Sequence, residues 1–84
     1  MEEQRKEPRI RSRGSVQLLV NGSQRVPGTI SDVSVSGIGV EAEAAISPET
    51  PVKIDCGDII AEGIVRFCRR QGPRYYIGIS LQAL

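Results

Sequence analysis

Apolar and polar side chains alternate along most of this chain, and a period of two indicates β-strands rather than helices. The clearest example is the segment 15–20, where Val16, Leu18 and Val20 fall on one side of the backbone and Ser15 and Gln17 on the other. Gly and Pro recur at intervals that leave room only for short segments. The pattern predicts six strands, at 15–20, 27–33, 37–43, 51–55, 59–67 and 74–81.

The segments between these strands carry turn signals. Asn21-Gly22 is the strongest of them, because both residue types tolerate the positive φ angles of a tight hairpin turn. Further turns are predicted at 34–36, 56–58 and 69–73. Ser47-Pro48-Glu49 has the residue types that begin a helical turn. Gly63, inside the fifth predicted strand, indicates a bend or a bulge.

Six short antiparallel strands must close on themselves, because an open sheet would leave its apolar face in water. The core must be aliphatic, since Trp is absent and the aromatic residues are two Tyr and one Phe. The candidate core residues are Val16, Leu18, Val20, Ile30, Ile38, Val40, Val52, Ile54, Ile59, Ile64, Val65, Ile77, Ile79 and Leu81. We predict an all-β fold, a small six-stranded antiparallel β-barrel at 14–84, which follows a flexible basic segment at 1–13, the N-terminal arm.

Charge is distributed unevenly along the 84 residues. The net charge of +1 gives the whole molecule little long-range attraction for nucleic acids or membranes. The N-terminal arm, however, contains five basic and three acidic residues. No apolar run is long enough to span a bilayer and the chain starts with a charged segment, so we expect a cytoplasmic protein without direct membrane insertion.

Residue types that carry catalysis are scarce. The sequence contains no His, and no nucleophile has a recognisable base partner. Two cysteines without His do not make a zinc site. In the absence of a secretory signal, we expect Cys56 and Cys68 to be buried or half-buried thiols rather than a disulfide. We therefore expect no enzyme activity, no metal and no other cofactor.

The first of two short polar motifs lies in the N-terminal arm, where Arg5 and Arg9 flank Pro8. Proline disfavours a helix at the residue before it and keeps this segment extended or turned. Guanidinium groups match the oxygens of a phosphate and the O6/N7 edge of guanine. The alternative interpretation is a basic arm whose charges are simply solvated.

The second motif is Asp32-x-Ser34-x-x-Gly37, which follows the second predicted strand. A turn built from Asp, Ser and Gly needs no ligand, so a purely structural role is the alternative. Strict alternation, however, places Asp32 on the core face with Ile30, which is unfavourable for a charge. A carboxylate at the end of the barrel that accepts hydrogen bonds from a base or from a turn would remove this conflict. Ser34 can donate or accept, and Gly37 permits a close backbone approach or a positive φ.

In this order, Arg5-x-x-x-Arg9 and Asp32-x-Ser34-x-x-Gly37 resemble the two-part signature of PilZ domains, bacterial receptors for cyclic di-GMP. The segments 37–40, 63–66 and 76–79 are similar to later blocks of the same family, so the resemblance covers nearly the whole chain. The fold of the family, a six-stranded antiparallel β-barrel, agrees with the strand prediction made from the alternation.

The resemblance implies that Arg5 and Arg9 contact the phosphates and guanine of the ligand, and that Asp32, Ser34 and Gly37 form the opposite wall. Family members often bind an intercalated pair of ligand molecules, and the residue before the first Arg influences that number. Candidate auxiliary contacts are Gln4, Lys6, Arg11, Arg13, Ser36, Arg66 and Gly78. For the arginines among them, solvated charge is the alternative.

These observations lead to the hypothesis of a cyclic di-GMP receptor that orders its N-terminal arm over the ligand. It would relay the signal to a downstream protein partner or a fused effector domain. One alternative is a PilZ-like adaptor that acts by protein–protein contacts without nucleotide. Another is a small nucleic-acid-binding barrel, although three aromatic residues are few for a stacking platform and the net charge is near zero.

Overall fold

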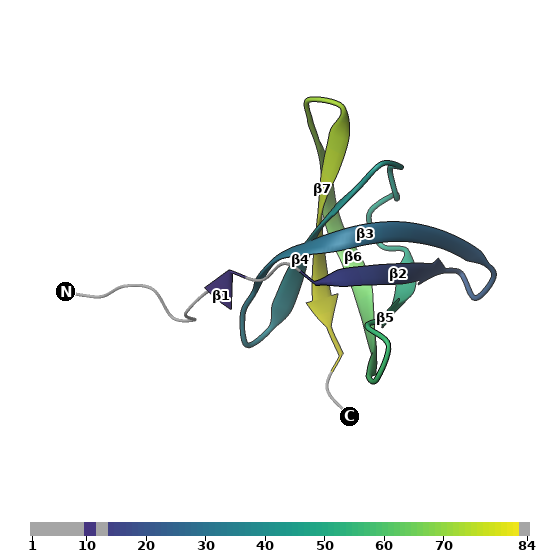
Figure 1. Cartoon of the computed structure of the whole chain (residues 1–84). Helices are drawn as coiled ribbons and strands as arrows, with labels where there is room; N and C mark the ends of the chain where they lie inside the picture. Colours follow the sequence, from purple (N-terminus) through teal and green to yellow (C-terminus); the bar gives the residue numbers. More distant parts are fainter. Residues whose placement is uncertain (1–9, 12–13, 83–84) are drawn as a thin grey trace.

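The structure, a computed structural model, describes residues 14–82 and the backbone of residues 10–11. Strands account for all the regular secondary structure in this part of the chain (Figure 1). They are β1 (Ile10–Arg11), β2 (Ser15–Val20), β3 (Gln24–Val33), β4 (Gly37–Ala42), β5 (Pro51–Asp55), β6 (Ile60–Gln71) and β7 (Arg74–Leu81). No helix of the length and apolarity that would cross a bilayer occurs among these residues.

The strands form one antiparallel sheet in the order β1-β3-β2-β5-β6-β7-β4, and an additional pairing of β3 with β4 closes the sheet. The closure depends on the length of β3, which pairs with β2 from Gln24 to Thr29 and with β4 from Gly28 to Val33. The ring from β2 to β7 is the predicted six-stranded barrel, and this prediction is confirmed. The far ends of β6 and β7 extend beyond the ring as a hairpin (Figure 1).

Two residues of the predicted N-terminal arm belong to the sheet. In β1, Ile10 pairs with Val33 and Arg11 pairs with Asp32, so the chain lies beside the last part of β3. The structure therefore differs at β1 from the prediction of a flexible arm through residue 13. The other predicted site residues of the arm lie outside the described residues, namely Gln4, Arg5, Lys6, Arg9 and Arg13.

The hairpin after β2 confirms the strongest turn prediction. Asn21 and Gly22 have φ angles of 52° and 78°, and the Ser23 amide donates to the Val20 carbonyl at 3.1 Å. The alternation predicts that the second strand begins at residue 27. The turn is compact enough that β3 instead begins at Gln24. The extra residues explain why Val26, which the sequence prediction leaves out of the core, is buried.

The hairpin between β6 and β7 is tighter than the polar loop predicted at 69–73, because only Gly72 and Pro73 separate the two strands. Gly72 has a φ of 60°, and its carbonyl accepts a hydrogen bond of 3.1 Å from Arg70 Nε. The Arg70 guanidinium also lies over the Tyr75 ring, 5.8 Å from its centroid. β6 can thus continue through polar residues that the sequence predicts to form a loop, because aromatic side chains on β7 lie against them.

Two local predictions in the second half of the chain are wrong. The segment at Pro48 and Glu49 is a turn without a helix, and Glu49 has a φ of 69°, which helical backbone does not adopt. This loop instead pairs with β6, since the Glu49 amide donates to the Val65 carbonyl at 2.7 Å. Gly63 lies in regular pairing, opposite Leu81. A Cβ there would lie 2.6 Å from the Ser80 carbonyl oxygen, so close packing of β7 explains this glycine.

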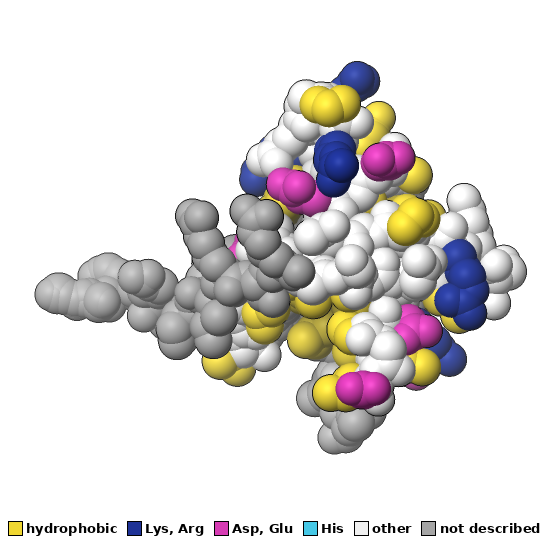
Figure 2. Space-filling view, in the orientation of Figure 1, with side chains coloured by type: hydrophobic (Ala, Val, Ile, Leu, Met, Phe, Trp, Pro, Cys, Tyr) yellow, Lys and Arg dark blue, Asp and Glu magenta, His cyan; other side chains and the backbone are white. Residues whose placement is uncertain are grey.

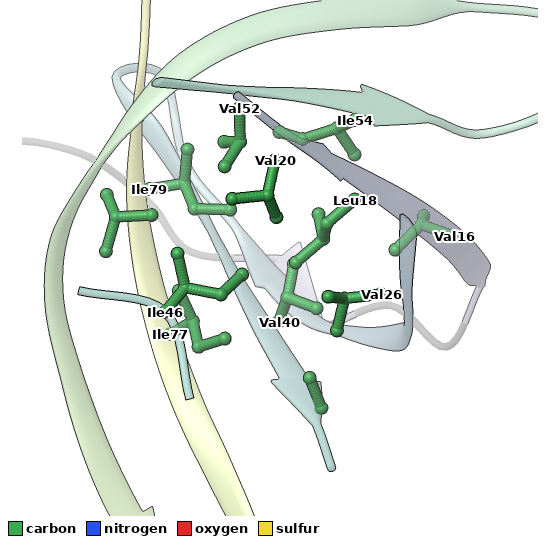
Figure 3. Close-up of a cluster of buried hydrophobic side chains, with 12 residues drawn as sticks. Val16, Leu18, Val20, Val26, Val40, Ile46, Val52, Ile54, Ile77 and Ile79 are labelled. Atoms are coloured by element: carbon green, nitrogen blue, oxygen red, sulfur yellow. The ribbon is translucent and has the colours of Figure 1, made fainter. Parts of the chain in front are cut away.

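The core is aliphatic, as predicted, and fills the barrel (Figure 3). Leu18, Ile54 and Ile77 are fully buried at its centre, and Ile46 from the loop after β4 closes one end. The buried cluster comprises Val16, Leu18, Val20, Val26, Val40, Ala42, Ile46, Val52, Ile54, Val65, Ile77 and Ile79. Of the other candidates, Ile30, Ile38 and Leu81 pack against it and Ile64 is half-buried.

The turn between β5 and β6 is more exposed than predicted. Ile59, a candidate core residue, is 68% exposed, because it belongs to the turn and its carbonyl accepts the Cys56 amide at 2.9 Å. Cys56 is exposed, which contradicts the prediction for its thiol, whereas Cys68 is half-buried as predicted. Both cysteines are free.

Candidate functional site

An open hollow of about 280 Å³ lies on the outer face of the barrel, where the β3–β4 hairpin meets β7 and β6. It brings together six of the twelve residues that the sequence analysis places in the site. These six residues are Asp32, Ser34, Ser36, Gly37, Arg66 and Gly78. Residues far apart in the chain thus converge on one surface, because β4 pairs with both β3 and β7.

Asp32 reaches this surface through a β-bulge. In the β3–β4 pairing Ile30 lies opposite Val40 and Asp32 lies opposite Gly39, so Ser31 is an extra residue on β3. Side chains directly opposite each other share a face of the sheet, and an extra residue moves the following side chain to the other face. The prediction that Asp32 shares the core face with Ile30 is therefore wrong, and the expected conflict with a buried charge does not arise.

Tyr76 of β7 reaches across β4 to Asp32. Its hydroxyl donates a hydrogen bond of 2.8 Å to Asp32 Oδ2, and both side chains are half-buried. The tyrosine ring passes over Gly39, where a Cβ would collide with the hydroxyl oxygen. Gly39 is thus required by the contact that gives the carboxylate a partner within the protein.

A second bulge places an aromatic ring beside the first. Val65 lies opposite Ile79 and Phe67 lies opposite Gly78, so Arg66 is the extra residue on β6. Phe67 consequently faces outward, and its ring lies over Gly78, where a Cβ would collide with it. Gly78 and Gly39 are themselves paired. The two glycines therefore leave a flat area of the sheet over which the two rings lie.

The two rings and one arginine form a cluster at the edge of the hollow. The centroids of Phe67 and Tyr76 are 5.8 Å apart, and their planes are tilted by 34°. The guanidinium carbon of Arg69 lies 5.4 Å from each centroid, which is within the range of cation–π attraction. Neither Phe67 nor Tyr76 is among the site residues predicted from the sequence. Glycines inside two strands were the available signal, because such positions mark a close approach of another group.

The turn between β3 and β4 supplies the remaining predicted residues. The Ser34 amide donates to the Gly37 carbonyl at 2.8 Å, and the Ser34 hydroxyl reaches the same oxygen at 3.4 Å. Val35 at the tip is 79% exposed. The turn predicted at 34–36 is confirmed, and its backbone is fixed by its own hydrogen bonds.

Gly37 has a structural reason to be glycine. A Cβ at this position would lie 2.7 Å from the Ile79 carbonyl oxygen, which is closer than real Cβ atoms approach. The sequence suggests two reasons for a glycine here, a close backbone approach and a positive φ. The structure supports the close backbone approach. Gly37 lies outside the residues whose φ is positive.

Basic side chains gather on the β6–β7 hairpin, at the top of Figure 2, with acidic side chains close by. Arg66 lines the hollow, and its guanidinium lies 3.5 Å from Glu49 Oε2, with side chains that are 52% and 73% exposed. Arg74 lies 4.0 Å from Glu43. Exposed pairs of this kind contribute little to stability, so Arg66 can change partners at small cost.

The backbone of β1 lies beside this surface. Ile10 pairs with Val33, which directly precedes Ser34, and Arg11 is opposite Asp32 in the register. In the sequence, Arg9 directly precedes Ile10. Among the described residues no group of His, Cys, Asp or Glu has the arrangement of a metal site. The surface offers a carboxylate, hydroxyls, an arginine and two aromatic rings, which suit a polar ligand with flat rings.

Comparison with known proteins agrees with this geometry. A family model described as PilZ domain matches residues 3–84, a range that includes both motifs and every strand. A comparison with curated proteins found no match. PilZ domains are receptors that bind cyclic di-GMP, and they are not enzymes. Because the match covers almost the entire chain, this protein belongs to the PilZ domain family.

Proposed function

We propose that this chain is a cyclic di-GMP receptor that binds the ligand in the hollow beside the β3–β4 hairpin. The observation that carries the proposal is the convergence of Asp32, Ser34 and Gly37 with Arg66 in one hollow. The pairing of β1 with β3 supports it further, because the arginine motif directly precedes β1 in the sequence.

The chemistry of the ligand fits the two sides of this site. Arg5 and Arg9 would contact phosphate oxygens and the O6/N7 edge of guanine, for which forked guanidinium groups are suited. Asp32 would accept from the N–H donors on the opposite edge of the base. Phe67, which is 42% exposed, offers a ring at the edge of the hollow against which a base can stack.

Ordering of the N-terminal arm over the ligand would then convert binding into a signal. Fixing the backbone of one residue costs about 1–2 kcal/mol, so several charge-assisted contacts are needed to order the arm. The pairing of Ile10 and Arg11 with β3 reduces this cost, since the end of the arm is already placed. The ordered arm would offer a new surface to a downstream partner or a fused domain in the cytoplasm.

Titration calorimetry of the purified chain with cyclic di-GMP tests the proposal and gives affinity and stoichiometry together. A thermal melt is the second measurement, because a ligand that binds only the folded state raises the midpoint. We expect saturable binding and a raised midpoint. If cyclic di-GMP neither binds nor raises the midpoint, a nucleotide-independent adaptor would be favoured. If the protein instead shifts single-stranded RNA in a gel, a nucleic-acid-binding barrel would be favoured.

Arg66→Ala is expected to weaken cyclic di-GMP binding by about threefold to tenfold, because the variant loses one contact to a charged ligand at an exposed position. The unfolding midpoint should hardly change, because Arg66 and its ion-pair partner Glu49 are both exposed. The matched control is Arg25→Ala, an exposed arginine at the opposite end of β3. Equal affinities for wild type and Arg66→Ala in calorimetry would remove Arg66 from the site.

A further inference from the structure

Tyr76 lies where its side chain can contact a ligand in the hollow as well as Asp32. Its direct partner on β4 is Glu41, but its ring leans over Gly39 toward β3 and lines the same hollow as Asp32. The hydroxyl oxygen and Asp32 Oδ2 are 2.8 Å apart. Two oxygen atoms from β3 and β7, the strands on either side of β4, thus form a closely spaced pair at the wall of the hollow.

The hydrogen bond fixes the chemical character of this pair. A tyrosine hydroxyl has one proton and two lone pairs, and an ionised carboxylate can only accept. The hydroxyl donates its proton to Asp32, so each oxygen of the pair acts as an acceptor toward any further partner. A ligand that meets this pair is recognised through adjacent donors rather than adjacent acceptors.

We propose that Asp32 and Tyr76 together read the donor edge of a guanine base, and that Tyr76 is a specificity-determining residue. This inference rests on the proposed cyclic di-GMP site. The ring N1–H and the exocyclic amino group of guanine are neighbouring donors, and the amino group distinguishes guanine from other purines. Asp32 accepts from the ring N–H, and the Tyr76 oxygen accepts from the amino group. Adenine has an acceptor at N1 and meets a lone pair there, which costs affinity.

The surroundings of Tyr76 hold the acceptor in place before any ligand arrives. The Phe67 ring packs beside it with centroids 5.8 Å apart, and the Arg69 guanidinium covers both rings at 5.4 Å. Gly39 provides the space under the ring. An acceptor that is already oriented loses little conformational entropy on binding, so its contribution to affinity is retained.

A cycle with two proteins and two ligands tests the proposal. Calorimetry would measure wild type and Tyr76→Phe against cyclic di-GMP and against the inosine analogue, cyclic di-IMP, which lacks the exocyclic amino group. In wild type we expect cyclic di-GMP to bind about threefold to tenfold more tightly than the analogue, the value of one hydrogen bond. In Tyr76→Phe, which keeps the ring, this ratio should fall to near one.

The ratio separates direct recognition from a structural role. Any loss that Tyr76→Phe causes by disturbing Asp32 acts on both ligands and leaves the ratio unchanged, so an unchanged ratio would overturn the proposal. Tyr75→Phe is the matched control, because Tyr75 lies on the adjacent position of β7 and outside the hollow. It should preserve the wild-type ratio. A wild-type protein that binds neither ligand would instead refute the proposed function itself.

Discussion

Arg9→Ala is expected to lower the affinity for cyclic di-GMP by about 10- to 100-fold, the largest effect of any single substitution in the site. Charge-assisted hydrogen bonds to phosphate contribute about 1.5–3 kcal/mol each, and every 1.4 kcal/mol corresponds to a factor of ten. Arg9 directly precedes Ile10, whose backbone pairs with Val33 beside the site. Calorimetry on the purified variant measures the loss.

Two comparisons make the Arg9 result interpretable. Arg25→Ala removes the same charge from the far end of β3 and should bind like wild type, so a loss restricted to Arg9→Ala cannot be an effect of net charge. The unfolding midpoint without ligand should stay within about a degree of wild type, since the buried cluster of the described residues is formed by side chains from Val16 to Ile79. Tight binding by both Arg5→Ala and Arg9→Ala would exclude the arm from the site.

Gly37→Ala is expected to lower the free energy of unfolding by about 1–3 kcal/mol in the absence of any ligand. The new methyl group would lie 2.7 Å from the Ile79 carbonyl oxygen, which is part of the backbone and cannot move without displacing β7. A loss of this size is a large fraction of the stability of a small domain. Urea denaturation of wild type and variant measures it.

Gly14→Ala is the matched control for this substitution. Among the described residues, a Cβ at Gly14 meets the end of the Ile30 side chain, at an ordinary 3.8 Å. Alanine there should leave the stability unchanged or raise it by up to about 1 kcal/mol, because it restricts the unfolded chain. If Gly37→Ala were as stable as wild type but bound ligand poorly, the glycine would serve the ligand alone and the packing explanation would be wrong.

The fold was largely predictable because its determinants are local. Val16, Leu18 and Val20 alternate with polar residues, and all three are buried as predicted. Asn21-Gly22 adopts the positive φ angles that its residue types favour. Closure of the barrel followed from the need to cover an apolar face, and that argument requires only the number and length of the strands.

The candidate site was predictable in its residue types but not in its geometry. Strict alternation placed Asp32 in the core, because nothing in Thr29–Val33 marks Ser31 as an extra residue. A bulge depends on the partner strand, and the sequence of one strand does not contain that information. Tyr76 was missed for a similar reason, since its partner Asp32 is 44 positions away and on a strand with which β7 does not pair.

The hairpin of β6 and β7 also bears on whether copies of this protein can associate by strand addition. β6 pairs with β5 only as far as Ile64, and the loop before β5 continues the pairing to Val65. Within the described chain, the rest of β6 therefore has a strand neighbour on one side only. An uncovered strand edge is a template to which a second copy can add by backbone hydrogen bonds. Arg69 and Arg70, held on this edge by the rings of β7, would bring like charges together in such a pairing. We therefore expect the arginines of the hairpin to hinder strand addition along this part of β6.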